Sequence, residues 1–127
     1  MSGANNLISD FLKPFFIPKK YRTMVMMYVT VSDHNIALSI AETILRERLT
    51  NHVNIIKANH CKVWKEDKIV ESVETLLLIK TKAMLYSHIE KKINEMNLED
   101  EPKVFSVPIT QIDHDYFDFL TLNVLKV

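Results

Sequence analysis

The chain has 127 residues, of which 47% are hydrophobic and 25% are charged. These proportions are typical of a soluble globular protein, and the length is enough for one domain with a substantial core. Lys plus Arg and Asp plus Glu number 16 each, so the formal net charge is zero. We therefore expect no electrostatic binding of nucleic acid or of an anionic membrane surface.

The scarcity of cysteine and glycine excludes further classes of chemistry. Cys61 is the single cysteine, so no internal disulfide can form, and we expect a reducing compartment such as the cytoplasm. Gly3 is the only glycine, which excludes Gly-rich phosphate loops and dinucleotide fingerprints. No apolar run reaches the ~20 residues of a membrane span. The core of a signal peptide is an uninterrupted apolar stretch. Phe11–Ile17 is interrupted by Lys13 and Pro14 and therefore makes a poor core of this kind.

Residues 1–22 lack a sustained hydrophobic period and contain Pro14, Pro18 and the pair Lys19-Lys20. We interpret them as an N-terminal extension, partly disordered, ahead of a single domain that spans residues 23–127. The apolar stretch within the extension leaves two alternatives. It is either a loosely packed tail or an arm that docks on the domain or on a neighbouring subunit.

The first two elements of the domain are a strand and an amphipathic helix. Met24–Val31 is a continuous apolar run of strand length, which is typical of a central strand buried on both faces. Ser32 or Asp33 then provides the N-cap of a helix that ends before Thr50-Asn51-His52. The apolar residues of this helix recur at helical spacing: Ile36, Ala37, Ile40, Ala41, Ile44 and Leu45.

A long hairpin follows, formed by Val53–Trp64 and Lys68–Thr81. Alternation with a period of two and β-branched residues predict both strands. Strands of a dozen residues reach about 40 Å, further than a domain of this size covers. We therefore expect the far end to project and to pair with another copy of the chain. In the second strand we expect two faces: Ile69, Val73, Leu77 and Ile79 on one, Glu71 and Thr75 on the other.

The remaining segments complete a mixed α+β domain. A second helix is predicted over Ala83–Asn97, a last strand over Val104–Ile109, and a short terminal helix capped by Asp113. With right-handed crossovers, this order predicts a ferredoxin-like βαββαβ fold. Its four-stranded antiparallel sheet carries both helices on one face, and the extra C-terminal helix follows.

Several short segments fall in an order and at a spacing shared with a known family. They are Val53-Asn54-Ile55-Ile56, Trp64, Lys68-Ile69-Val70-Glu71 and Leu77-Leu78-Ile79-Lys80-Thr81. Together they resemble the CutA divalent-cation tolerance family, over about Met24 to Leu120. The resemblance implies a ferredoxin-like subunit in a tight homotrimer held by strand pairing between subunits, with a role in the response to divalent metal ions.

The metal ligands that the resemblance implies are not kept. Bacterial members are proposed to bind copper through a cysteine late in the first strand and a histidine and glutamate in a later motif. The corresponding positions here are Val29, Asn97 and Lys103. Valine offers no ligand atom, and lysine brings a positive charge where a carboxylate would lie. We therefore predict that no metal binds at these positions and that the protein has no cofactor. The binding of a divalent metal such as copper at another site is left as an alternative.

The family pattern also marks a set of polar and amphipathic residues. In a trimer they could line a cleft between subunits. There they would either make polar contacts that hold the subunits together or form a ligand-binding site. His60 and Cys61 do not add a metal pair, because adjacent residues on a strand point to opposite faces. The cleft candidates are Trp64, Lys68, Glu71, Lys80 and Tyr116.

The sequence shows no catalytic constellation. Cys61 lacks a catalytic signature, and Glu71 and Glu74 face opposite sides of one strand, so they do not form an acid–base pair. We interpret the chain as a non-enzymatic trimeric protein of metal tolerance whose partner is itself. One alternative is a nucleotide- or small-molecule-binding signalling trimer of the nitrogen-regulatory type, against which the lack of glycine loops argues. The other is an unrecognised enzyme in the inter-subunit cleft.

Overall fold

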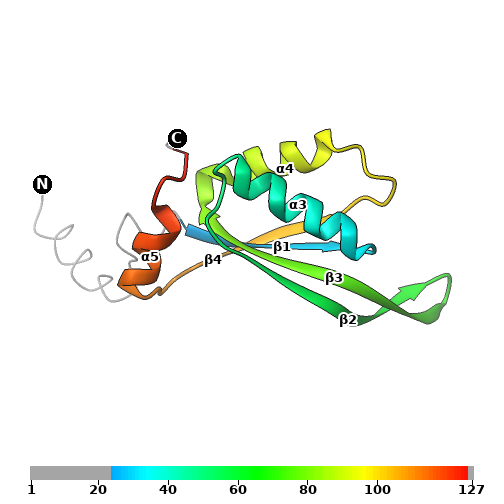
Figure 1. The fold of residues 1–127 in the computed structure, drawn as a ribbon. Helices are drawn as coiled ribbons and strands as arrows, with labels where there is room; N and C mark the ends of the chain where they lie inside the picture. Colours follow the sequence, from blue (N-terminus) through cyan, green and yellow to red (C-terminus); the bar gives the residue numbers. More distant parts are fainter. Residues whose placement is uncertain (1–23, 126–127) are drawn as a thin grey trace, which may run out of the picture.

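A four-stranded antiparallel sheet with helices on one face forms the body of the molecule (Figure 1). The computed structural model describes residues 24–125, so the predicted extension lies outside the described residues. The strand order is β2-β3-β1-β4, and the predicted order of strands and helices is confirmed. Within residues 24–125, no helix has both the length and the apolar character needed to cross a membrane.

The element bounds lie close to those predicted. The second helix differs most, because it starts as a 3-10 turn and ends at Glu95, before Asn97 takes a left-handed conformation with φ 50°. The elements are β1 (Met24–Val31), α3 (His34–Arg46), β2 (Val53–Lys65), β3 (Lys68–Lys82), η2 (Ala83–Leu85), α4 (Tyr86–Glu95), β4 (Lys103–Pro108) and α5 (His114–Thr121).

The main core lies between α3, α4 and one face of the sheet. Asp33 caps α3 as predicted, because its carboxylate accepts a hydrogen bond of 2.7 Å from the backbone N–H of Asn35. From there the apolar face of α3 packs on β1 and β3, and each buried aliphatic side chain contributes roughly 1.5–3 kcal/mol. The buried residues of this contact are Ala37, Ile40, Ala41 and Ile44 on α3, Met27, Val29 and Val31 on β1, and Leu77 and Ile79 on β3.

The predicted division of β3 into apolar and polar faces is wrong. Thr75 is 3% exposed and lies on the same helix-covered side as Leu77 and Ile79. These residues are separated by two positions along a strand without a bulge, so their side chains share one face. Glu71 shares this face with Ile69 for the same reason. Polarity alone therefore misassigned Thr75, whose small β-branched side chain is tolerated in the core.

A β-bulge interrupts β2 between Ile56 and Asn59. Ile56 pairs with Leu76 and Asn59 with Glu74, so two residues of β2 lie opposite one residue of β3. Ala58, inside the bulge, has a left-handed φ of 58°. The extra residue reverses which side chains of β2 face the helices beyond this point.

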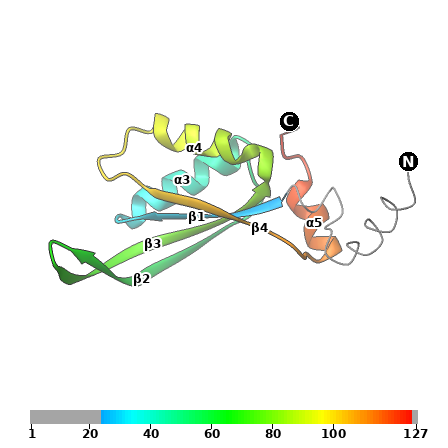
Figure 2. The ribbon, with the colours of Figure 1, turned by 180° about the vertical axis from the view of Figure 1, so that it is seen from behind.

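The far half of the hairpin projects beyond the rest of the subunit (Figure 1 and Figure 2). The pairing of β1 with β3 ends at Val31 opposite Thr75, whereas β2 and β3 stay paired as far as Lys65 and Lys68. Residues 59–65 and 68–74 therefore form a two-stranded projecting hairpin about 20 Å long. This confirms the predicted long hairpin.

The hairpin tip is a two-residue turn in which both residues are left-handed. Glu66 has φ 50° and Asp67 has φ 60°, as in the primed turns that suit the twist of paired strands. Glycine and asparagine are the usual residues in such turns, and Asp67 is among the better-tolerated substitutes. Glu66 has no such local advantage, so the tip stores backbone strain.

Replacing Asp67 with glycine should relieve part of this strain. A left-handed residue with a Cβ costs about 1–2 kcal/mol, and the greater freedom of glycine in the unfolded chain offsets some of the gain. We expect Asp67→Gly to raise the free energy of unfolding by roughly 0.5–1 kcal/mol, measured by urea denaturation at one protein concentration. Ser72→Gly, within extended β3, should lower it instead, and a loss of stability in both variants would contradict the argument.

Candidate functional site

The predicted cleft residues separate into two groups at opposite ends of the hairpin. Trp64, Lys68 and Glu71 lie on the projecting hairpin, whereas Lys80 and Tyr116 lie near α5 at the other end of the molecule (Figure 1). From Lys68 to Lys80 the strand runs for about 40 Å. One chain therefore does not bring the two groups together.

The projecting hairpin exposes large apolar side chains on one face. Trp64 is 71% exposed and lies directly opposite Ile69, which is 64% exposed. Val73, two alternations further along the same face of β3, is 51% exposed. We call the side chains of Trp64, Ile69 and Val73 the hairpin surface. No helix of residues 24–125 covers it, because α3 and α4 lie over the core half of the sheet (Figure 2).

Lys80 is at the centre of the group near α5. Only 6% of this residue is exposed, and its ammonium group donates hydrogen bonds to the side-chain carbonyl of Asn54 and, at 3.3 Å, to the backbone carbonyl of Leu78. No ion pair found within residues 24–125 includes Lys80. The lysine is therefore a nearly buried cation whose described acceptors are neutral.

His52 and Tyr116 complete this group. The Nδ1 atom of His52 lies 2.6 Å from the hydroxyl oxygen of Tyr116, and the two rings meet edge-on with centroids 5.8 Å apart. Asp113 caps α5 as predicted and accepts a hydrogen bond from the backbone N–H of Tyr116. Asn51 donates to backbone carbonyls of Phe119 and Leu122, which fastens α5 to the start of β2.

The ionisation of this group follows from burial. Burial, and then the positive charge of Lys80, lowers the pKa of His52 below its ordinary value. Burial also lowers the pKa of Lys80 and raises the pKa of Tyr116. At neutral pH His52 is thus a neutral imidazole that shares one hydrogen bond with the Tyr116 hydroxyl, in which either Nδ1 or the hydroxyl oxygen is the acceptor, depending on the tautomer.

The sequence did not single out His52, because the contact with Tyr116 spans 64 positions of the chain. The available signal was the segment Thr50-Asn51-His52, which separates the first predicted helix from the long hairpin.

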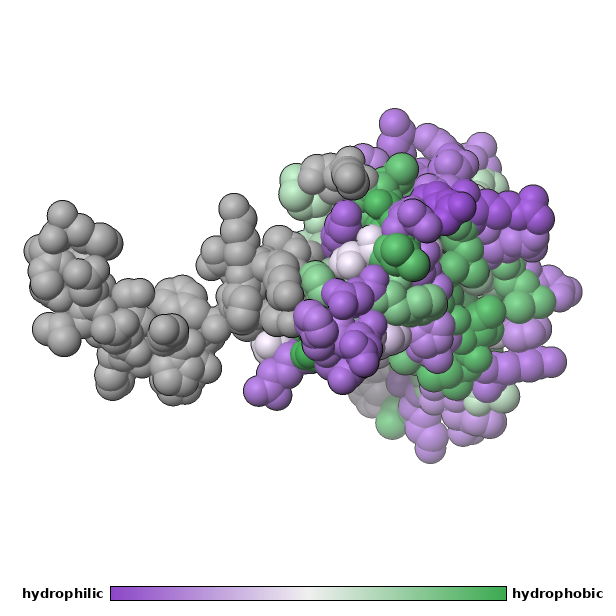
Figure 3. All heavy atoms as spheres, turned by 60° about the vertical axis from the view of Figure 1, so that its left-hand side comes forward, coloured by the Kyte–Doolittle hydropathy of each residue, from purple (hydrophilic) through white to green (hydrophobic). Residues whose placement is uncertain are grey.

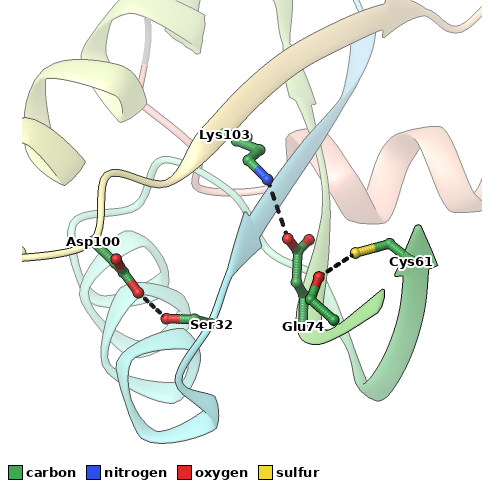
Figure 4. A network of polar contacts seen from close by, with 6 residues as sticks. Ser32, Cys61, Glu74, Asp100 and Lys103 are labelled. Carbon is green, nitrogen blue, oxygen red and sulfur yellow. Dashed lines mark hydrogen bonds and ion pairs between the residues drawn. The ribbon is translucent and has the colours of Figure 1, made fainter. Parts of the chain in front are cut away.

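The positions of the bacterial copper ligands have other roles here. Val29 is fully buried in the core, and Asn97 ends the α4 region in a left-handed conformation. The ammonium of Lys103 on β4 lies 3.2 Å from a carboxylate oxygen of Glu74 on β3, across β1 (Figure 4). In the part of the chain from 24 to 125, no three His, Cys, Asp or Glu residues are grouped so that they could hold a metal ion.

His60 and Cys61 also lack the geometry of a ligand pair. Cys61 lies beside Ser72 on β3, with 2.8 Å between sulfur and hydroxyl oxygen (Figure 4). His60 pairs with Val73 and is on the opposite face of β2.

Comparison with known proteins places this architecture in a family. Residues 25–123 match the family model described as CutA1 divalent ion tolerance protein. The chain belongs to the CutA1 family. The Divalent-cation tolerance protein CutA of Pyrococcus horikoshii is 28% identical over 103 residues, which cover 81% of this chain and all of the relative. The chloroplastic Protein CutA of Arabidopsis thaliana is 30% identical over 96 residues, 76% of this chain and 53% of that protein.

Solved CutA1 structures share the fold. The crystal structure of CutA1 from Oryza sativa has a TM-score of 0.75 at 27% identity and covers 86% of this chain and 100% of that one. The structure of the divalent cation tolerance protein from Thermus thermophilus gives 0.71 at 26% identity, over 80% and 98%. The predicted family is thus confirmed, together with an α+β fold built on a four-stranded antiparallel sheet.

The lowered pKa of His52 predicts a pH dependence of stability. The unfolded chain, in which the pKa returns to about 6.5, binds a proton more readily than the folded chain. The contribution of His52 to stability is therefore complete above about pH 6.5 and falls as the pH drops below that value. Urea denaturation at pH 7.5 and 5.5 (about one unit to either side of 6.5) should show a smaller loss for His52→Gln than for the unmodified chain.

The control for this measurement is His88→Gln, because His88 is exposed on α4. It should leave the pH dependence unchanged. An equal loss of stability at low pH in the His52→Gln variant and the unmodified chain would refute the role given to His52.

Proposed function

We propose that this CutA1-family protein is a non-enzymatic homotrimer that acts in the cellular response to divalent cations. Its relatives are named divalent-cation tolerance proteins, and the names describe no catalysed reaction. They favour this function over a nucleotide-binding signalling trimer. We propose the cytoplasm as its location on the ground of its single cysteine, although relatives are named chloroplastic or periplasmic.

The main support for the proposed trimer is the projecting hairpin. Over Lys68–Glu74, β3 pairs with β2 and has no described strand on its other side. Its outward backbone N–H and C=O groups form an open strand edge, which readily pairs with another chain. The exposed hairpin surface on the same strands adds apolar area that gains from burial. A second copy of the chain can satisfy both requirements at once.

The sheet face opposite the helices supports the same conclusion. On this face Tyr28 stacks against Phe105, with ring centroids 4.7 Å apart and planes inclined by 8°. Phe105, Ile56 and Val63 are all exposed there, the last on the projecting hairpin. Pairing between different strand edges is heterologous and must close into a ring to avoid a filament. The family resemblance favours a ring of three.

We propose that no divalent cation binds at Val29, Asn97 and Lys103, the positions that correspond to the copper ligands proposed for bacterial members. Lys103 already pairs with Glu74, and its ammonium would repel a second cation at that point. Val29 has no donor atom and is enclosed by the core. A cation that the protein binds must therefore use other groups, either of one subunit or of several.

Charge on the hairpin surface should prevent assembly. In the variant Ile69→Lys/Val73→Lys, each substitution removes roughly 1.5–3 kcal/mol of apolar burial per subunit and places like charges at each interface. We expect light scattering at micromolar concentration to give a trimer mass for the unmodified chain and a lower mass for this variant.

The matched control is Leu38→Lys, because this leucine is 43% exposed but belongs to α3 and not to the projecting hairpin. It should remain trimeric. A folded monomer of the unmodified chain, or a trimer of the doubly charged variant, would contradict the proposed assembly.

Copper titration tests the absence of the bacterial site. In competition with a chelator we expect no stoichiometric binding tighter than micromolar. If such binding occurs and is lost on Asn97→Ala or Lys103→Ala, the bacterial positions do bind metal and the prediction is wrong. Binding that survives both changes would point to another site.

A further inference from the structure

The charge of Lys80 is uncompensated among the described residues. An ammonium group removed from water loses hydration energy, which neutral amide and carbonyl acceptors restore only in part. Burial lowers the pKa of Lys80, and none of the ion pairs within residues 24–125 includes its ammonium group. A buried cation in such surroundings is stabilised most effectively by an anion.

The donors around Lys80 are suited to a particular kind of anion. The ammonium has three N–H donors, and contacts with Asn54 and Leu78 account for two of them. Val53 pairs with Ile79, so His52, which precedes Val53, lies beside Lys80 at this end of the hairpin, and its Nδ1 is in contact with Tyr116. A single cationic group with one remaining N–H donor suits the single negative charge of a carboxylate, whereas a phosphate dianion is usually met by more positive charge.

We infer that Lys80, His52 and Tyr116 form a receptor for a carboxylate group at the α5 end of the sheet. Tyr116 orients the imidazole through the 2.6 Å contact, and Lys80 supplies the charge. This end of the molecule is seen in Figure 3, where hydrophobic residues lie at the surface between hydrophilic ones.

The carboxylate has two possible sources. One is a small organic acid. The other is an acidic side chain on the projecting hairpin of a second copy, where Glu71 is exposed on the face that carries Ile69 and Val73. The second source rests on the proposed trimer, and the first does not.

Acetate is the probe for the receptor. The ring signals of His52 are followed by NMR while sodium acetate replaces sodium chloride at constant ionic strength. For a vacant receptor we expect a saturable shift in the unmodified chain. The apparent affinity should fall at least tenfold in Lys80→Met, which keeps the length of the side chain, and also in Tyr116→Phe, which keeps the ring. The same spectra report whether each variant is folded.

Glu71→Gln distinguishes the two sources. A response to acetate in the unmodified chain identifies a receptor open to a small acid. A response that occurs only after Glu71→Gln identifies the neighbouring subunit as the source. If acetate moves the His52 signals in neither protein, or moves them equally in Lys80→Met, the inference is overturned.

Light scattering on the same samples separates this inference from the proposed function. A monomer whose His52 signals respond to acetate through Lys80 refutes the trimer and supports the receptor. A trimer without any Lys80-dependent response, with or without Glu71, supports the assembly and refutes the receptor.

Discussion

The pairing of β3 is the constraint on which the rest of the structure depends. Near its C-terminal end the strand lies between β1 and β2, and its side chains Leu77, Ile79 and Thr81 are fully buried. Near its N-terminal end the same strand has one neighbour, and Ile69 and Val73 are exposed. A single continuous strand therefore joins a packed core to a surface with no partner in its own subunit.

Polar contacts position the group near α5. Thr50 donates a hydrogen bond of 2.6 Å to the backbone carbonyl of Lys80, and Thr81 donates to the backbone carbonyl of Leu49. With the contacts from Asn51 to α5, these bonds tie the segment before β2 to β3 on one side and to the terminal helix on the other. His52 is held between the two. On the β3 side the hydrogen bonds of Thr50 and Thr81 are buried and therefore costly to lose, whereas those of Asn51 to α5 are exposed.

Local signals predicted most of the fold, and contacts between distant segments account for what was missed. Asp33 and Asp113 identified two helix starts because capping involves neighbours in sequence. The bulge at Ala58 left no such signal, since no glycine marks it. The cluster of His52, Lys80 and Tyr116 could not be assembled from spacing, because it joins three elements that meet only when the sheet and α5 have formed.

Left-handed backbone positions in this protein are occupied by residues with side chains. Among residues 24–125, every residue with positive φ is a non-glycine residue, and most lie at turns or beside the ends of elements. A Cβ atom at such a position strains the folded chain, but it also restricts the conformations of the same residue when the chain is unfolded. The entropic part of this balance grows with temperature, so the disadvantage of these residues relative to glycine becomes smaller as the protein is warmed. The residues are Arg48, Ala58, Glu66, Asp67, Asn97 and Asn123.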